Sequence, residues 1–238
     1  MLLICLPFSW FWLSAQELKS FSQSLVAVSF FSSNILFWYT TNYFESAAEL
    51  KPLLHTWSLA VEEQYYLFFP LFIISTWKFG KRWMLTIFLI VSLASLLAAQ
   101  SNVISNPSTA FYLLHTRIWE LILGVFVSFY FFKEKKLKAS RLAREVGGII
   151  GLLLIIFSIF MFDSNTPSPS FYTLVPTVGA VLIILYAGRD TSIGIFLSNK
   201  ILVSIDLISY SSYLWHQPLF AFARLRSAEE PSTVFFPY

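Results

Sequence analysis

The sequence has 238 residues, of which 57% are hydrophobic, 19% aromatic and only 12% charged. A soluble domain carries about 25% charged residues, so this composition excludes an ordinary water-soluble globule and predicts a protein that crosses a bilayer several times. One cysteine excludes an internal disulfide, and together with three histidines it excludes a metal site built from grouped thiolates. The net charge of +3 does not indicate nucleic acid, because the basic residues lie in short loops between apolar runs.

Apolar runs predict where the chain crosses the membrane. The opening run, 2–13, is shorter than the roughly 20 residues needed to span the hydrocarbon layer, so its span is doubtful. Seven further runs are predicted to be spanning helices: 22–39, 53–77, 83–99, 110–132, 146–162, 171–187 and 201–223. Since helices satisfy their backbone hydrogen bonds within such a segment, the predicted fold class is an all-α, polytopic membrane bundle of about seven to eight transmembrane helices.

The charge of the loops predicts the orientation of these helices. Twelve of the 16 Lys and Arg residues lie in one set of alternating loops, and the opposite set contains only Lys51. Because Lys and Arg are retained on the cytoplasmic side, the first set is predicted to be cytoplasmic. It comprises the segment around Lys19 together with 78–82, 133–145 and 188–200, whereas 40–52, 100–109 and 163–170 are predicted to lie outside. Retention on the cytoplasmic side is enough to explain the basic segment 133–144. The alternative function of this segment is to attract a polyanion, such as anionic lipid or a nucleotide-bearing donor.

Two carboxylates lie in the middle of a predicted span. Glu62 and Glu63 would each cost about 2.5–3.5 kcal/mol in hydrocarbon, so we expect them to face a protein interior or a wet cavity. Helical spacing puts Glu62 on the same face as His55, about 10 Å away along the axis. The two side chains could flank a ligand without bonding to each other. A buried structural network that joins helices is an equal alternative.

Other ionisable residues lie in two later spans. Arg117 and Glu120, three residues apart, are predicted to pair on their helix, and the alternative for Arg117 is donation to an oxyanion or a sugar hydroxyl. In the last span Pro218 cannot donate to the Leu214 carbonyl, which predicts a kink beside His216. A lone membrane histidine more often ties helices together than reacts. As a hypothesis, Glu62 or Glu63 shares a polar cavity with His55, Arg117 and His216.

Three motifs carry a family resemblance. The first comprises residues 34–38 (NILFW), Tyr43-Phe44 and residues 52–66 (PLLHTWSLAVEEQYY), and two shorter ones follow in order at residues 117–121 (RIWEL) and 209–216 (SYSSYLWH). The sequence thereby resembles the acyltransferase 3 family of membrane O-acyltransferases, in the branch that modifies lipopolysaccharide or peptidoglycan. The matches extend over most of the chain from about 34 to 220.

The resemblance implies a reaction and its participants. Members move an acyl group, commonly acetyl from acetyl-CoA, onto a hydroxyl of an envelope polysaccharide or lipid-linked sugar, without a metal, in the bacterial inner (plasma) membrane. Acyl transfer to an alcohol needs a base and donors for the oxyanion. The candidates for catalytic roles are His55, Glu62, Glu63 and His216. The candidates for substrate binding are Arg117, Glu120, Tyr213 and Trp215.

The sequence also departs from the family pattern. Members open with helices that carry an Arg about ten residues before a catalytic His and a nearby Arg-x-x-Arg, whereas here the Arg-x-x-Arg spacing occurs only at Arg141 and Arg144, in a predicted loop. The resemblance therefore implies that residues 1–238 are a partial transmembrane domain, without its first helices and its end, and inactive alone. The alternatives to an acyltransferase are an inactive or assembly membrane module, and a transporter or flippase of an envelope precursor.

Overall fold

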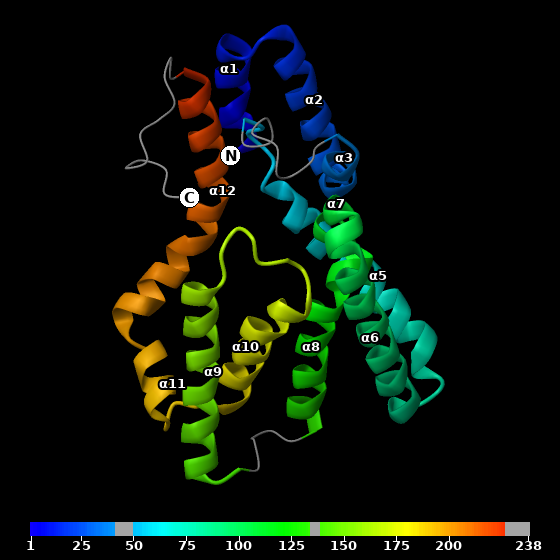
Figure 1. The fold of residues 1–238 in the computed structure, drawn as a ribbon, viewed down its shortest axis with the longest axis vertical. Coiled ribbons are helices and arrows are strands. Elements are labelled where there is room, and N and C mark those ends of the chain that lie inside the picture. The colour runs from blue at the N-terminus through cyan, green and yellow to red at the C-terminus, as the bar shows by residue number, and fades with distance from the viewer. Residues whose placement is uncertain (41–49, 134–138, 227–238) are drawn as a thin grey trace. The chain divides into compact units, whose positions relative to one another are not determined.

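A computed structural model of the chain describes residues 1–40, 50–133 and 139–226 (Figure 1). Over these ranges the chain folds into helices with short connections and contains no strand, which confirms the predicted all-α class. The helices are α1 (Leu2–Trp12), α2 (Ala15–Ser29), α3 (Ser33–Thr40), α5 (Thr56–Trp77), α6 (Lys81–Ser105), α7 (Pro107–Tyr112), α8 (Leu114–Lys133), α9 (Arg141–Met161), the 3-10 turn η1 (Phe171–Thr173), α10 (Leu174–Tyr186), α11 (Ser192–Leu197) and α12 (Lys200–Arg226).

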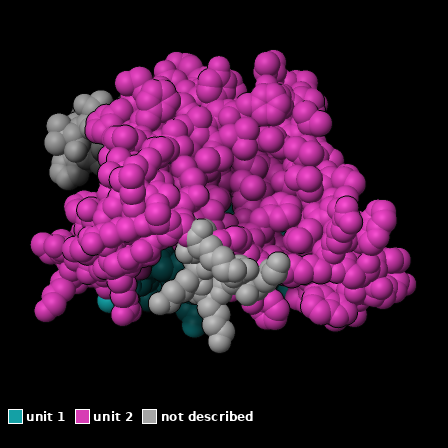
Figure 2. Space-filling model, turned by 90° about the horizontal axis from the view of Figure 1, so that it is seen from below, with its two compact units in different colours: residues 1–66, 207–238 teal, residues 67–206 magenta. Residues whose placement is uncertain are grey.

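The chain forms two compact units (Figure 2). Unit 1 comprises Met1–Tyr66 and Leu207–Tyr238, and unit 2 comprises Leu67–Asp206. Helices α5 and α12 contribute residues to both units. The histidines of the first and third motifs belong to unit 1, whereas the second motif belongs to unit 2.

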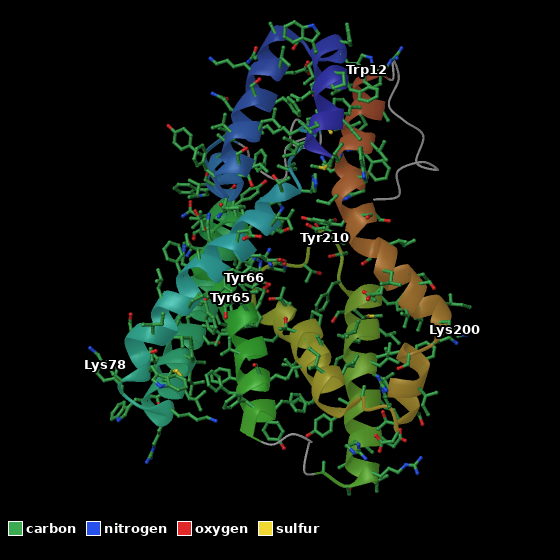
Figure 3. All side chains as sticks on the ribbon, turned by 180° about the vertical axis from the view of Figure 1, so that it is seen from behind. Trp12, Tyr65, Tyr66, Lys78, Lys200 and Tyr210 are labelled. Carbon is green, nitrogen blue, oxygen red and sulfur yellow. The ribbon has the colours of Figure 1, made fainter. Side chains whose placement is uncertain are left out.

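Unit 1 is held by a small apolar core beneath α1, α2 and the last turns of α12. Cys5, Phe21, Leu53 and Phe222 are buried together in this core. At the α1–α2 turn, Ser14 and Glu17 form a capping box, in which the Ser14 amide donates to the Glu17 carboxylate at 2.8 Å. Trp12 lies beside the end of α12, where the Arg226 guanidinium is 5.1 Å from the centre of its ring (Figure 3).

The single helix predicted over 22–39 is wrong. Helix α2 ends at Ser29 and α3 begins at Ser33. Between them Phe31 has φ 53°, a left-handed conformation that no helix continues through. The Ser32 amide donates to the Ala27 carbonyl at 2.8 Å, and the hydroxyls of Ser32 and Ser33 donate to backbone carbonyls of Ala27 and Thr56. Apolar content alone did not reveal this break.

Among the residues that the structure describes, three segments are long and apolar enough to cross a membrane, judged by length and composition: Lys81–Ser105, Pro107–Phe132 and Arg141–Met161. The predicted count of seven to eight spans is not confirmed. Helices α5 and α12, with 22 and 27 residues, are long enough but interrupt their apolar sequence with Glu62, Glu63 and Gln64 and with the Ser, Tyr and His side chains of SYSSYLWH. Helix α10 has only 13 residues. Of the loops used to predict orientation, residues 41–49 and 134–138 lie outside the described residues.

In unit 2 the segment after α10 is tied to the start of α9. Arg144 pairs with Asp190 through both of its terminal nitrogens, and Nη1 donates to Oδ1 at 2.8 Å. The neighbouring Glu145 carboxylate accepts from the Ser192 amide at 2.9 Å. Thr191 then caps α11, since its hydroxyl accepts from the Gly194 amide at 3.2 Å. The charged start of α9 thus fixes the entry into α11.

We expect acid to weaken the contacts that hold the start of α11 against the start of α9. Hydrogen bonding from Arg144 lowers the pKa of the Asp190 carboxyl below its ordinary value of 3.8. Because the folded-state pKa is depressed, the pairing contributes its full stability above that ordinary value and loses it as pH falls through the lower one. Amide hydrogen exchange of residues 192–197 measures this effect. In Asp190→Asn the acid-dependent increase should be smaller than in the unmodified chain, and equal acid dependence in the two proteins would contradict the prediction.

Candidate active site

His55 occupies a tight turn just before α5. The Leu54 amide donates to the Lys51 carbonyl at 3.2 Å, and the Thr56 amide donates to the Leu53 carbonyl at 3.1 Å. These bonds direct the imidazole into unit 1, where His55 is only 6% exposed. Neither of its ring nitrogens has a hydrogen-bond partner among the described residues. Buried polar atoms in proteins are nearly always hydrogen-bonded, so this imidazole is free to engage a ligand or a water molecule.

His216, on α12, lies beside His55. The centres of the two rings are 5.5 Å apart, and the Tyr213 ring lies 5.4 Å from His55 and 5.6 Å from His216. The Tyr213 hydroxyl donates to the His55 carbonyl at 2.5 Å. Its single proton is used in that bond, so Ser58 Oγ, 2.6 Å away, donates to the Tyr213 oxygen. These contacts connect α12 to the turn before α5 and hold the two imidazoles close together.

The proton of neutral His216 can be assigned from its backbone contact. Its Nδ1 lies 2.6 Å from the Tyr213 carbonyl oxygen. A carbonyl oxygen only accepts, so Nδ1 carries the proton and Nε2 bears the lone pair. The next residue, Gln217, donates through Nε2 to the Lys51 carbonyl at 3.1 Å and anchors this part of α12 to the turn that carries His55. His216 Nε2 is therefore chemically suited to accept a proton.

The two carboxylates do not lie inside this cluster. Glu62 and Glu63 are both exposed on α5, and Glu62 is close enough to Tyr213 for an electrostatic interaction. A partly buried polar contact of this stretch is made by Gln64, which sequence reasoning did not select. Its Nε2 donates to Asn34 Oδ1 and to the Phe31 carbonyl, both at 2.8 Å. The joint presence of Asn34 and Gln64 in the first motif is the signal that could have indicated this pair.

The substrate-binding candidates fall into two groups. In unit 2, Arg117 Nη1 lies 3.3 Å from Glu120 Oε1, which confirms the predicted i,i+3 pair, and Arg117 Nε donates to the Phe111 carbonyl at 3.3 Å. In unit 1, Tyr213 belongs to the histidine cluster, and Trp215 lines an apolar cavity of about 270 Å³ between α1 and α12. A cavity shared by the histidines with Arg117 stays a prediction. Within the described ranges, no three His, Cys, Asp or Glu side chains are grouped to hold a metal ion.

Comparison with known proteins gives the family. A family model described as an acyltransferase domain matches residues 1–237. The O-acetyltransferase OatA of Staphylococcus aureus, in strains NCTC 8325 / PS 47 and COL, is 32% identical over 211 residues, which cover 83% of this chain and 34% of OatA. A further protein of strain COL, grouped by its name with the O-acetyltransferases, is 30% identical over 224 residues, 88% of this chain and 36% of that protein.

These matches set the extent of the similarity. The chain spans about a third of the length of the curated relatives that it matches. No solved structure matches it. The matched family model covers residues 1–237 of 238 and includes all three motifs. The chain therefore belongs to the acyltransferase 3 family.

Proposed function

We propose that this chain provides the membrane-embedded part of an O-acyltransferase. In this proposal it transfers an acetyl group from acetyl-CoA to a hydroxyl of a cell-envelope carbohydrate, in the bacterial plasma membrane. Family membership supports acyl transfer, and the names of the Staphylococcus aureus relatives support acetyl as the group and a bacterial setting. The three apolar segments in unit 2 support a membrane location.

The observation that carries the proposal is the pairing of His55 with His216. Two imidazoles with centres 5.5 Å apart can serve one reaction centre, and His55 keeps both ring nitrogens free of protein partners among the described residues. His216 has its Nδ1 proton engaged by the Tyr213 carbonyl, which leaves Nε2 as the basic nitrogen. A general base needs this kind of fixed orientation toward the proton that it removes.

The proposed reaction is a single acyl transfer. His216 Nε2 takes the proton of the acceptor hydroxyl while the alcohol oxygen attacks the thioester carbonyl carbon. An N–H of His55 donates to the oxyanion that forms, as donors do in other acyl transfers. When the tetrahedral intermediate collapses, the carbon–sulfur bond breaks and the coenzyme A thiolate takes the proton from the His216 imidazolium. The products are an acetyl ester and free coenzyme A, and both histidines return to their starting state.

A transfer assay tests this function. Membranes that contain the chain receive acetyl-CoA labelled in the acetyl group, and label incorporated into envelope polysaccharide is measured. We expect incorporation by the unmodified chain and a fall of about 10²-fold or more in the His55→Ala/His216→Ala double variant, since the base is lost. The control is His115→Ala, which removes the third histidine, on α8, and should keep the activity.

The outcomes separate the proposal from its alternative. No incorporation by the unmodified chain would contradict the proposal for this chain and agree with the expectation that the principal base is absent from it. Incorporation that survives in the double variant would show that the histidine pair is not the reaction centre. Loss of activity in His115→Ala to the same extent would indicate a general effect of histidine removal on folding.

A further inference from the structure

We infer that a cavity next to the turn that carries His55 is a binding subsite for the carbohydrate acceptor, an inference that rests on the proposed function. The cavity has a volume of about 410 Å³. It lies in unit 1, between the first turns of α2 and residues 50–52. Small-molecule sites typically occupy about 300–1,000 Å³, so the cavity can hold a sugar ring.

The wall formed by α2 presents hydrogen-bonding groups on one face of the helix. Gln16, Ser20 and Ser24 follow one another at intervals of four residues, and Glu17 lies beside them. Neither the Gln16 amide nor the Ser20 hydroxyl has a hydrogen-bond partner among the described residues. These two side chains can therefore donate to and accept from a ligand without breaking a bond in the protein.

The charges at the cavity favour a neutral, hydroxyl-rich ligand over an anion. The Glu17 carboxylate lies on its wall and would repel phosphate or carboxylate. The lining cation, Lys51, is engaged elsewhere, since its ammonium donates to the Thr40 carbonyl at 3.2 Å and lies 5.9 Å from the centre of the Phe37 ring. Sugar hydroxyls both donate and accept, which suits amide, hydroxyl and carboxylate groups presented together.

The cavity is connected to the histidine pair through Lys51. The Lys51 backbone carbonyl accepts from the Leu54 amide at 3.2 Å, within the turn that holds His55. The same carbonyl accepts from Gln217 Nε2 at 3.1 Å, next to His216 in the sequence. One residue thus lines the cavity and anchors both histidine-bearing segments. A saccharide held against α2 would therefore lie against the turn that carries His55 and to which Gln217 of α12 is bonded.

Binding of a neutral saccharide tests the subsite. The purified full chain in nanodiscs is titrated with fluorescein-labelled chitotetraose, and the Kd is read from fluorescence anisotropy. In the Gln16→Ala/Ser20→Ala double variant we expect the Kd to rise about tenfold, because two hydrogen bonds are lost. The matched control is Gln23→Ala/Ser22→Ala, which changes the same residue types on the exposed face of α2 and should shift the Kd less than about twofold.

Two further measurements distinguish the possible failures. Inorganic phosphate should not displace chitotetraose; displacement, or no saccharide binding, would overturn the inference. The His55→Ala/His216→Ala variant should bind chitotetraose as the unmodified chain does. If the α2 variants leave the Kd and the acceptor KM unchanged while the histidine variant loses transfer, the subsite is wrong and the proposed function stands. If saccharide binding depends on α2 but no transfer occurs, the subsite stands and the proposed function fails.

Discussion

Replacing His216 by asparagine should abolish acetyl transfer as completely as replacing it by alanine. Both changes remove Nε2, the nitrogen that bears the lone pair, so we expect kcat to fall by about 10²–10⁴-fold in each. Asparagine nevertheless keeps an N–H near the position of Nδ1, which donates to the Tyr213 carbonyl in the unmodified chain. The measurement is the rate of labelled acetyl incorporation at saturating acceptor, alongside a thermal unfolding curve in detergent.

The asparagine variant separates chemistry from structure. If His216 only ties α12 to its own backbone and to the turn before α5, asparagine should restore much of the activity lost in alanine. If His216 is the base, asparagine should restore the unfolding temperature but not kcat. Recovery of kcat to within about tenfold of the unmodified chain would contradict the role as base.

The sequence supported predictions about individual helices better than predictions about which distant segments contact each other. The i,i+3 spacing of Arg117 and Glu120 sufficed to predict their ion pair, because helix geometry is local. The motifs suggested that His55 and His216 share a site but could not establish their contact, since Tyr213 and His55 are 158 residues apart in the sequence. Helical periodicity does not determine which faces of distant helices meet.

A second limit explains why the segment predicted as one helix over 22–39 is two helices. The run 22–39 is apolar enough to suggest one span, yet its serines and Phe31 break it into two helices. The sequence predicted that His55 and the carboxylates of α5 face one site. His55, in the turn before α5, belongs to the histidine cluster, whereas Glu62 and Glu63 are exposed. Composition measures how apolar a segment is, and it does not register the local hydrogen bonds that end a helix.

The glycines of α9 were a further signal that the sequence contained. Gly147 and Gly151 are four residues apart, a spacing of small residues that lets membrane helices approach closely. In unit 2 this face packs against α10 (Figure 1). A Cβ added at Gly151 would lie 2.8 Å from the Gly179 carbonyl oxygen and 3.0 Å from the Ile183 amide nitrogen. These contacts are with backbone atoms, which cannot move aside as a flexible side chain can.

We therefore expect Gly151→Leu to separate α9 from α10. The leucine side chain has no space at the crossing, and overpacking of this kind costs about 1–3 kcal/mol of the free energy of unfolding. The measurement is unfolding of the chain in mixed micelles by increasing SDS. The matched control is Gly124→Leu on α8, since a Cβ at Gly124 would meet nothing within 4 Å. This control should change the free energy of unfolding by no more than about 0.5 kcal/mol. Equal losses of stability in the two variants would contradict the prediction, because they would show that leucine is poorly tolerated for a reason other than the close approach of α9 and α10.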